Sequence, residues 1–368
     1  MTTMQVARLH AIGDPMRLEQ VPVPEPRPTD VVVEVKACNF VPNLKNVLAL
    51  YAEWFPFLPL PELPAVFGLD SAGVVSQVGS EVTGWSVGDR IYVNPALSCR
   101  ACRACVAGEV QACPTYTFMA YFSFSADGQK LFDAYPYGGF AEYLTAPQGN
   151  LVRLPDSVTF EQGARFGYLG TAFSALRKGR VGPGSTVLID GIGGTLGVGA
   201  TLIALGLGAT TILGTGRNAD LLADVQALAP DRIQVLAAGD RPVADWVREQ
   251  TDGLGADVLI DALAPDAPAQ AMVDAVSGLR RGGIAVNIGG MMEPAPLNVL
   301  WMMTAGISLL GSLWFTTSEA QDMADLVGAG AIDLSVLENQ VHRLDQVNEA
   351  LDSLPARHGG FTNFIIAP

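Results

Sequence analysis

The hydrophobic and polar positions along the chain change their rhythm near residue 160. Before that point, short apolar runs are separated by Gly, Ser and Pro, and VVVEVKA at residues 31–37 is the clearest of them. Segments 66–79 and 90–94 have the same strand-like character, and the Pro-rich segment 22–28 favours extended chain. These patterns predict a mainly β region with no long helix before residue 160.

Beyond residue 160, strand-length and helix-length apolar segments alternate. Strands are expected at 185–190, 210–215, 257–263, 283–290 and 307–315, and helices at 195–209, 218–229, 268–279 and 318–330. This alternation is typical of a parallel sheet covered by helices on both faces. The sequence therefore predicts an α/β fold with a mainly-β domain (1–160) and a doubly wound Rossmann domain (161–315). A C-terminal segment (316–368) is expected to pack back on the first domain.

Composition narrows the classes of function. The 368 residues carry a formal net charge of −15 and no basic block, which argues against binding nucleic acid. No apolar run approaches the length of a membrane span, and the N-terminus lacks the basic-then-apolar order of a signal peptide. We expect a cytoplasmic protein without a membrane partner.

Four of the five cysteines lie close together in the sequence. Cys99, Cys102, Cys105 and Cys113 have the spacing C-x2-C-x2-C-x7-C. Four thiolates held by tight turns suit tetrahedral zinc, and a site with four protein ligands is closed to substrate. We predict one structural zinc ion per chain; buried or redox-paired cysteines are the alternative.

A glycine-rich turn joins the strand at 185–190 to the helix that follows it. It comprises Gly191, Gly193, Gly194, Thr195, Leu196 and Gly197. Glycines let a pyrophosphate approach the backbone, and the helix N-terminus favours its negative charge. Because the strand, the turn and the helix occur in this order, the pattern predicts a dinucleotide site.

The end of the next strand indicates which dinucleotide binds. An acid at this point would bind the ribose 2′-hydroxyl, but the sequence reads Thr215, Gly216, Arg217, Asn218. A guanidinium can hold a 2′-phosphate through two hydrogen bonds. NADP(H) is therefore the expected cofactor, although Arg217 could instead be a solvated charge at a helix start.

Together with GGFAEY at 138–143, these motifs resemble the zinc-type alcohol dehydrogenase branch of the medium-chain dehydrogenase/reductase superfamily over nearly the whole chain. The resemblance implies a GroES-like catalytic domain, a Rossmann domain and a homodimer or homotetramer. It also implies that further residues line the nicotinamide cleft: Thr171, Ala262, Leu263, Ile288, Gly289, Leu313 and Trp314.

The sequence departs from the family where a catalytic zinc would bind. The family's Gly-His-Glu triplet reads Gly68-Leu69-Asp70, and Gly167 stands where a third ligand would fall. The remaining ligand position is ambiguous, because alignment places Val41, Cys38 or Asn39 there. One cysteine cannot supply the three protein ligands of a catalytic site, so we expect no catalytic zinc.

Without that metal, hydrogen-bond donors must meet the charge on the substrate oxygen. By family analogy the candidates are Asn43, Lys45, Asp70 and Tyr168, each of which has a plain structural alternative. The aromatic residues Trp54, Phe55 and Phe57 lie in an expected long loop and could form a hydrophobic substrate wall, an oligomer contact or a lid.

The preferred function is therefore an NADP(H)-dependent enzyme that exchanges hydride with a hydrophobic carbonyl or alcohol. A quinone or enone reductase, acting on an activated C=C bond, is the nearest alternative. A non-catalytic NADPH-binding sensor or structural protein is the alternative from another class.

Overall fold

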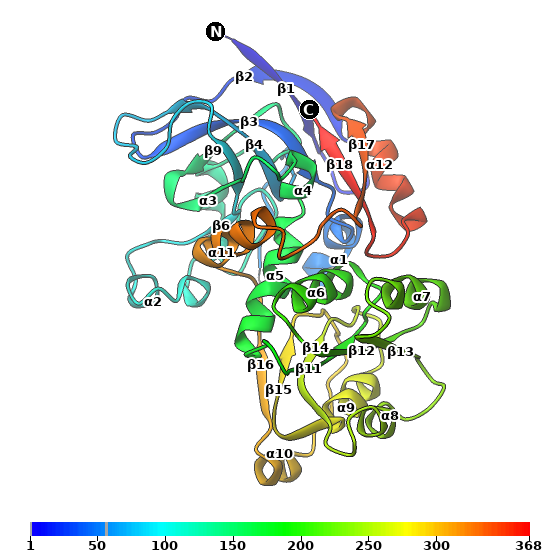
Figure 1. Cartoon of the computed structure of the whole chain (residues 1–368). Coiled ribbons are helices and arrows are strands. Elements are labelled where there is room, and N and C mark those ends of the chain that lie inside the picture. The colour runs from blue at the N-terminus through cyan, green and yellow to red at the C-terminus, as the bar shows by residue number, and fades with distance from the viewer. Residues whose placement is uncertain (1, 56–57) are drawn as a thin grey trace.

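The chain folds into two parts that lie one above the other in Figure 1, with the cleft between them. The computed structural model describes residues 2–55 and 58–368. The N-terminal half, together with the C-terminal end of the chain, forms the upper part, and the middle of the chain forms the lower part. Within the described residues, no helix is long and apolar enough to cross a membrane.

A seven-stranded sheet forms the core of the upper part. Its order is β10-β5-β4-β3-β18-β17, with β9 also paired to β3. The bounds are β3 (Asp30–Asn39), β4 (Asp70–Val78), β5 (Arg90–Val93), β9 (Tyr143–Pro147), β10 (Leu151–Arg153), β17 (Glu338–Arg343) and β18 (Thr362–Ala367). Val31, Val32 and Val33 of β3 are all fully buried, because strands cover this one on both edges.

Two smaller sheets complete the upper part. They contain β1 (Thr3–Arg8) with β2 (Arg17–Pro22), and β6 (Ala96–Leu97) with β7 (Thr117–Phe118) and β8 (Phe122–Ser123). Short helices lie in the connections: α2 (Arg103–Val106), α3 (Gln129–Ala134), η1 (Val110–Ala112) and η2 (Gln148–Asn150).

Helix α1 (Leu44–Trp54) corrects the expectation that no long helix precedes residue 160. Its buried residues Leu44, Val47 and Tyr51 recur every three or four positions, which is the spacing of one helical face. Trp54 ends this helix, so the expected long loop is shorter than its sequence suggested. Phe57 lies outside the described residues.

The lower part is a six-stranded parallel sheet in the order β13-β12-β11-β14-β15-β16. The bounds are β11 (Thr186–Asp190), β12 (Thr211–Gly216), β13 (Ile233–Ala237), β14 (Ala256–Asp261), β15 (Leu279–Asn287) and β16 (Ser308–Gly311). The strand order reverses between β11 and β14, so the connections that follow these two paired strands run in opposite directions and leave a crevice at their carboxyl ends.

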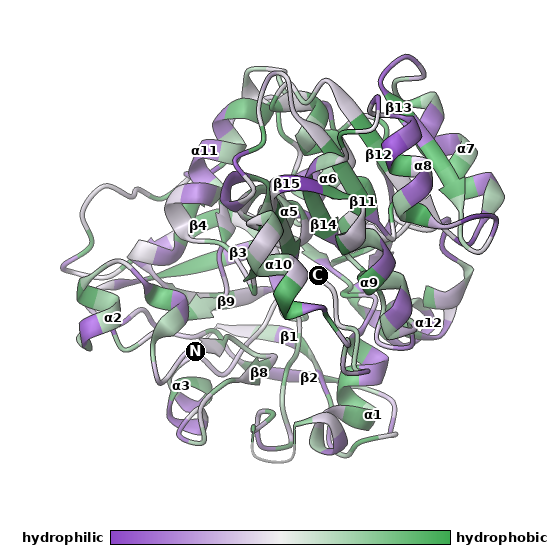
Figure 2. Cartoon of the chain, turned by 90° about the horizontal axis from the view of Figure 1, so that it is seen from below, coloured by the Kyte–Doolittle hydropathy of each residue, from purple (hydrophilic) through white to green (hydrophobic). Residues whose placement is uncertain are grey.

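Helices cover this sheet on both faces, as the run of fully buried strands requires. In Figure 2 the strands β11, β12 and β14 are predominantly hydrophobic, whereas α7, α8 and α9 mix hydrophobic and polar residues. The helices are α6 (Thr195–Gly206), α7 (Ala219–Ala227), α8 (Val243–Glu249), α9 (Ala269–Ser277) and α10 (Val299–Ala305). The sheet and its covering helices form the predicted doubly wound domain.

Two helical segments and the C-terminus connect the parts. The first segment consists of α4 (Phe160–Gly163) and α5 (Phe166–Lys178), and the second is α11 (Thr317–Gly328). Three short helices follow α11 near the C-terminus: η3 (Leu344–Gln346), α12 (Val347–Ser353) and η4 (Leu354–Ala356). The chain then returns to the upper sheet, where β18 pairs antiparallel with β3. This return brings the residues just before β18 against the glycine-rich turn.

Candidate functional site

A cavity of about 540 Å³ lies between the two parts of the molecule. The first part contributes residues before and within α1 and around β4, β7 and β8, and the second contributes the start of α6 and the segments after β14 and β15. Most of the residues predicted to form the cleft line it: Asn43, Asp70, Tyr168, Thr171, Gly194, Thr195, Leu196, Ala262, Leu263, Ile288, Gly289, Leu313 and Trp314.

The glycine-rich turn has the geometry that a dinucleotide phosphate needs. Gly191 has φ +84°, and a Cβ atom there would lie 2.9 Å from the carbonyl oxygen of Ala262. Glycine is therefore required to start this turn. Gly194 precedes α6 with extended dihedrals and makes no side-chain cap, so the first N–H groups of the helix remain available to an anion beside the cavity.

Of the residues at the end of β12 and after it, Thr215 and Asn218 make hydrogen bonds within the protein, and Arg217 is exposed. Thr215 is buried and donates its hydroxyl to Asp190, and Asn218 caps α7 by accepting from the N–H groups of Asp220 and Leu221. Arg217 is 78 % exposed and lies 3.7 Å from a carboxylate oxygen of Asp266, which lines the cavity. Of these three residues, Arg217 has an exposed side chain that is held by this one ion pair.

Asp70 is a buried carboxylate at the wall of the cavity. It is 1 % exposed, accepts a hydrogen bond of 2.7 Å from the Tyr92 hydroxyl, and accepts a longer one of 3.4 Å from the Asn39 amide. Burial raises the pKa of Asp70 from 3.8 to about 7, because the two donors only partly replace the lost solvation. The group can therefore hold or release a proton near neutral pH.

The space beside Gly167 is filled by the Asp70 carboxylate. A Cβ atom at Gly167 would lie 2.2 Å from Oδ1 and 2.3 Å from Oδ2 of Asp70. Any larger residue at 167 must therefore displace the carboxylate. Leu69, which has no donor atom, lines the same cavity and is 5 % exposed. These residues do not fit the metal site that the family resemblance implies.

The third position does not restore such a site. Val41 lines the cavity and offers no donor, whereas Cys38 and Asn39 are fully buried in β3. Burial and the neighbouring Asp70 charge raise the pKa of Cys38, which opposes the thiolate that zinc requires. In the described residues, the only group of three or more His, Cys, Asp or Glu able to hold a metal is the four-cysteine lobe.

The other candidate donors have distinct positions. Tyr168 is partly buried at the cavity, and burial followed by the Asp70 charge raises its pKa. Asn43 precedes α1 and makes no side-chain cap, but accepts from Asn46 at 3.2 Å. Lys45 does not line the cavity: it is 62 % exposed and pairs with Asp352 at 3.5 Å. Lys45 therefore has no place among the candidate donors.

Aromatic side chains do line the cavity, but they are not those that the sequence suggested. Neither Trp54 nor Phe55 is among the lining residues. The aromatic wall comes from the segment around β7 and β8 and from the two junctions between the parts: Phe118, Tyr121, Phe122, Tyr168 and Trp314. Trp314 stacks on Phe315 with ring centroids 4.8 Å apart, and its indole nitrogen donates to Asn94 at 3.0 Å, so this wall is firmly held.

The C-terminal return adds a residue that the sequence analysis missed. Nη1 of Arg357 lies 3.3 Å from the hydroxyl of Thr195 at the start of α6, and the N–H of Gly360 donates to Gly193 at 3.0 Å. Arg357 is some 160 residues from the turn in sequence, so no local motif could have indicated it. A cation at this helix N-terminus would add to the attraction for a phosphate group.

The four cysteines meet in one lobe as predicted. Their Sγ atoms all lie within 4.8 Å of one another, and the N–H groups of Cys99, Cys102 and Cys105 point at Sγ atoms of Cys113, Cys99 and Cys102. N–H donors from Ala101 and Cys102 lower the pKa of Cys99 to about 6, which favours a thiolate. The donor set fits a four-coordinate zinc ion.

Two family profiles match the chain. One, described as the alcohol dehydrogenase GroES-like domain, matches residues 27–156, and the other, described as zinc-binding dehydrogenase, matches residues 195–329. Together they cover more than two thirds of the chain. The chain belongs to the zinc-type branch of the medium-chain dehydrogenase/reductase superfamily.

Named relatives align along nearly its full length. An alcohol dehydrogenase of Geobacillus stearothermophilus is 27% identical over 95% of this chain and 96% of its own. An NAD-dependent alcohol dehydrogenase of Sulfurisphaera tokodaii is also 27% identical, over 95% of this chain and 96% of its own. A crystal structure of an NAD-dependent alcohol dehydrogenase superposes with a TM-score of 0.82, at 27% identity, over 99% of this chain and 100% of its own. The protein is an oxidoreductase of this superfamily that acts on a small molecule.

Proposed function

We propose that this protein is an NADP(H)-dependent oxidoreductase that transfers hydride between the nicotinamide and a hydrophobic carbonyl or alcohol carbon, without a catalytic zinc ion. The observation that carries the proposal is the single cavity in which the start of α6, an aromatic wall and the Asp70 carboxylate meet. The dinucleotide, when bound, supplies the hydride chemistry, and the chain supplies binding, orientation and proton transfer.

The preference for NADP(H) rests on the residues that follow β12. No carboxylate stands at Gly216 to receive a ribose 2′-hydroxyl, and the exposed Arg217 is held only by a 3.7 Å contact with Asp266. A surface ion pair of this kind contributes little, so a 2′-phosphate can compete for the guanidinium. Two relatives are named as NAD-dependent. We propose that this chain differs from them in cofactor preference, through the residues after β12.

The filled space beside Gly167 supports the proposal that no catalytic zinc binds. The Asp70 carboxylate occupies the volume of a side chain at that position, and Leu69 and Val41 supply no metal-binding atom. We propose that the substrate oxygen instead meets Asp70, Tyr168 and Asn43, all of which line the cavity. In carbonyl reduction, protonated Asp70 would donate a proton to that oxygen.

We propose that the four-cysteine lobe holds one structural zinc ion. Its Sγ atoms leave no room for a fifth ligand from substrate, and the lobe lies at the rim of the molecule, away from the nucleotide turn. The zinc would therefore stabilise the lobe and take no part in the reaction.

A quinone or enone reductase is the second candidate, because an aromatic wall suits a planar conjugated substrate as well as an aldehyde. The deciding experiment follows NADPH oxidation with cyclohexane carbaldehyde, cyclohexanone and cyclohexenone. Faster reduction of the aldehyde or ketone supports the first proposal, and faster reduction of the enone C=C bond supports the second. NADPH binding without turnover on a broad panel would favour a non-catalytic sensor and contradict both.

We also propose a homodimer formed through β16. This strand is the edge of the parallel sheet, all of its residues are exposed, and Leu309 and Leu310 belong to it. Nearby α10 exposes Val299, Leu300 and Met303. An exposed apolar edge strand offers unpaired backbone groups to a second copy related by a two-fold axis. Light scattering should find a dimer that Leu310→Lys converts to a monomer; a monomeric unmodified protein would contradict this.

A further inference from the structure

A second cavity, of about 500 Å³, lies beside the cleft and is not explained by the proposed function. It is bounded by the cysteine lobe, the end of α5 and the segments that follow β15 and β16. Ile288, Gly289 and Leu313 line both this cavity and the cleft. The two cavities therefore adjoin at these three residues.

Lys178, the last residue of α5, supplies the cation of this second cavity. Its Nζ atom donates to the Ser312 hydroxyl at 2.9 Å. Among the described residues no carboxylate lies within 4.0 Å of Nζ, whereas the other three lysines, Lys36, Lys45 and Lys130, each pair with one. An unpaired, half-buried ammonium group is unusual in a chain with a net charge of −15.

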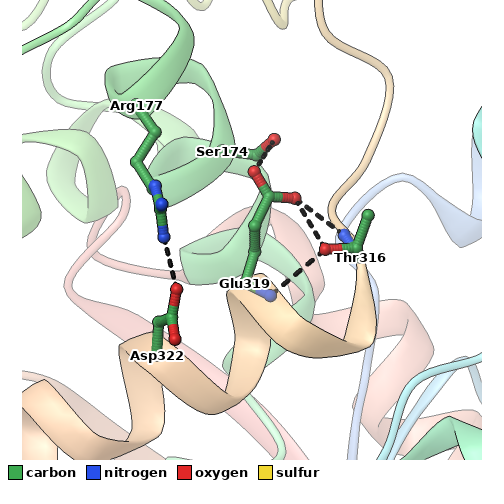
Figure 3. A network of polar contacts seen from close by, with 5 residues as sticks. All are labelled: Ser174, Arg177, Thr316, Glu319 and Asp322. Carbon is green, nitrogen blue, oxygen red and sulfur yellow. Dashed lines mark hydrogen bonds and ion pairs between the residues drawn. The ribbon is translucent and has the colours of Figure 1, made fainter. Parts of the chain in front are cut away.

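Two acidic groups of α11, which packs against α5, are already engaged, as Figure 3 shows. Glu319 accepts from the Ser174 hydroxyl at 3.0 Å and from the N–H and hydroxyl of Thr316. Asp322 pairs with Arg177, the residue before Lys178. These contacts cap α11 and hold it to α5. Lys178 is therefore left to face Ser312 and the second cavity.

The other polar groups of this cavity suit an anion with oxygen acceptors. The Ser312 hydroxyl and the Gln111 amide are donors, and the Gln111 amide is held by a 3.4 Å bond to the carbonyl of Trp314. The Asp261 carboxylate is fully buried and accepts, at 2.8 Å, from the amide of Asn287, which lines the cavity. Burial lowers the pKa of Lys178, and the nearby Glu319 charge offsets this effect only in part.

We propose that this second cavity is an anion site, in which Lys178, Ser312 and Gln111 bind a carboxylate. The carboxylate is either the far end of the substrate held in the cleft or a free small anion. The first case rests on the proposed function, since it needs a substrate that turns over, and the second does not.

A purely structural role for Lys178 makes a different prediction. A cation in the last turn of a helix interacts favourably with the helix dipole, and the bond to Ser312 holds α5 to the segment after β16. In that case replacing Lys178 would change the melting temperature but neither anion binding nor substrate preference.

The test uses Lys178→Met, with Lys130→Met as the matched control, because Lys130 lies on the exposed surface and lines neither cavity. With NADPH, kcat/KM is measured for 4-carboxybenzaldehyde and for its methyl ester. Succinate binding to the NADP-loaded protein is measured by calorimetry. A charge-assisted hydrogen bond supports an expected loss of roughly ten-fold or more in one of the two measurements.

Each outcome decides the question. If Lys178→Met, but not Lys130→Met, loses the preference for the acid over the ester, the site binds the substrate carboxylate. If Lys178→Met, but not Lys130→Met, loses only its affinity for succinate, the site binds a free anion. If Lys178→Met matches Lys130→Met in both, the proposal is overturned. If the unmodified protein reduces neither aldehyde, the proposed function fails while the succinate result still judges the site.

A measurement on the unmodified protein tests the site even if Lys178→Met does not fold. Acetic anhydride acetylates accessible amines, and mass spectrometry reports each lysine separately. Succinate should slow acetylation of Lys178 and leave Lys130 unchanged. Equal rates with and without succinate, in a protein that also shows no acid-over-ester preference, would contradict the anion site.

Discussion

Replacement of Asp70 by Asn separates the structural and catalytic roles of this buried acid. The substitution keeps the shape of the side chain and removes its titration. The rise of the Asp70 pKa from 3.8 to about 7 corresponds to about 4 kcal/mol of lost preference for the charged form. The folded state therefore binds a proton that the unfolded state releases between these two values.

The sign of the stability effect follows from this difference in proton binding. Because the folded pKa is raised, the contribution of Asp70 is fully present below the unfolded value and is lost as the pH rises through the folded value near 7. The unmodified protein should lose about 3 kcal/mol from this group between about pH 5 and pH 8, and Asp70→Asn should lose none of it.

The assay is differential scanning calorimetry of both proteins across that pH range, at about 2–4 °C per kcal/mol. Asp127→Asn is the control, because Asp127 is 69% exposed and pairs only with Lys130. The melting temperature of Asp70→Asn should rise relative to that of the unmodified protein as the pH increases. A difference that stays constant with pH would refute a raised pKa for Asp70.

The catalytic part of the same experiment measures carbonyl reduction with NADPH. If Asp70 donates the proton, kcat/KM should fall above about pH 7, and Asp70→Asn should lose roughly 100-fold or more while remaining folded. Turnover of Asp70→Asn within a few-fold of the unmodified protein would leave Asp70 as a residue that only fills the space beside Gly167.

Three further predictions concern the metal, the packing and the cofactor. Elemental analysis should find one zinc ion per chain, and Cys105→Ser should remove it; two ions per chain would contradict the filled ligand space beside Gly167. Gly167→Ala should destabilise the protein by about 1–3 kcal/mol and less in an Asp70→Ala background, which a double-mutant cycle measures. Arg217→Ser should raise KM for NADPH by roughly ten-fold or more and leave KM for NADH nearly unchanged; an equal effect on both would contradict a 2′-phosphate contact.

The parts of the fold that could be predicted from sequence are those with a strong local pattern. Buried strands such as β3 and β11 are runs of Val, Ile and Leu between turn residues, and α6 follows a glycine-rich turn. Helix α1 was missed because its apolar face, Leu44, Val47 and Tyr51, leads directly into a segment rich in Pro and aromatic residues that suggested a loop. The aromatic wall of the cleft was missed for a different reason, since Phe118 and Phe122 lie in two-residue strands without any period.

Some features of the site could be predicted from the sequence, whereas others depend on how distant residues pack together. Leu69 and Gly167 could each be recognised as positions without a metal-binding atom, but they are about a hundred residues apart, and nothing in either local pattern connects them. The structure joins them through Asp70, whose carboxylate takes the volume that Gly167 leaves open and is held there by Tyr92. A loss of ligands alone would leave a buried gap, and such a gap costs stability. Because the Asp70 carboxylate fills this space, a group with a pKa near 7 lies against the cleft, where we propose that it stabilises the substrate oxygen in place of a metal ion.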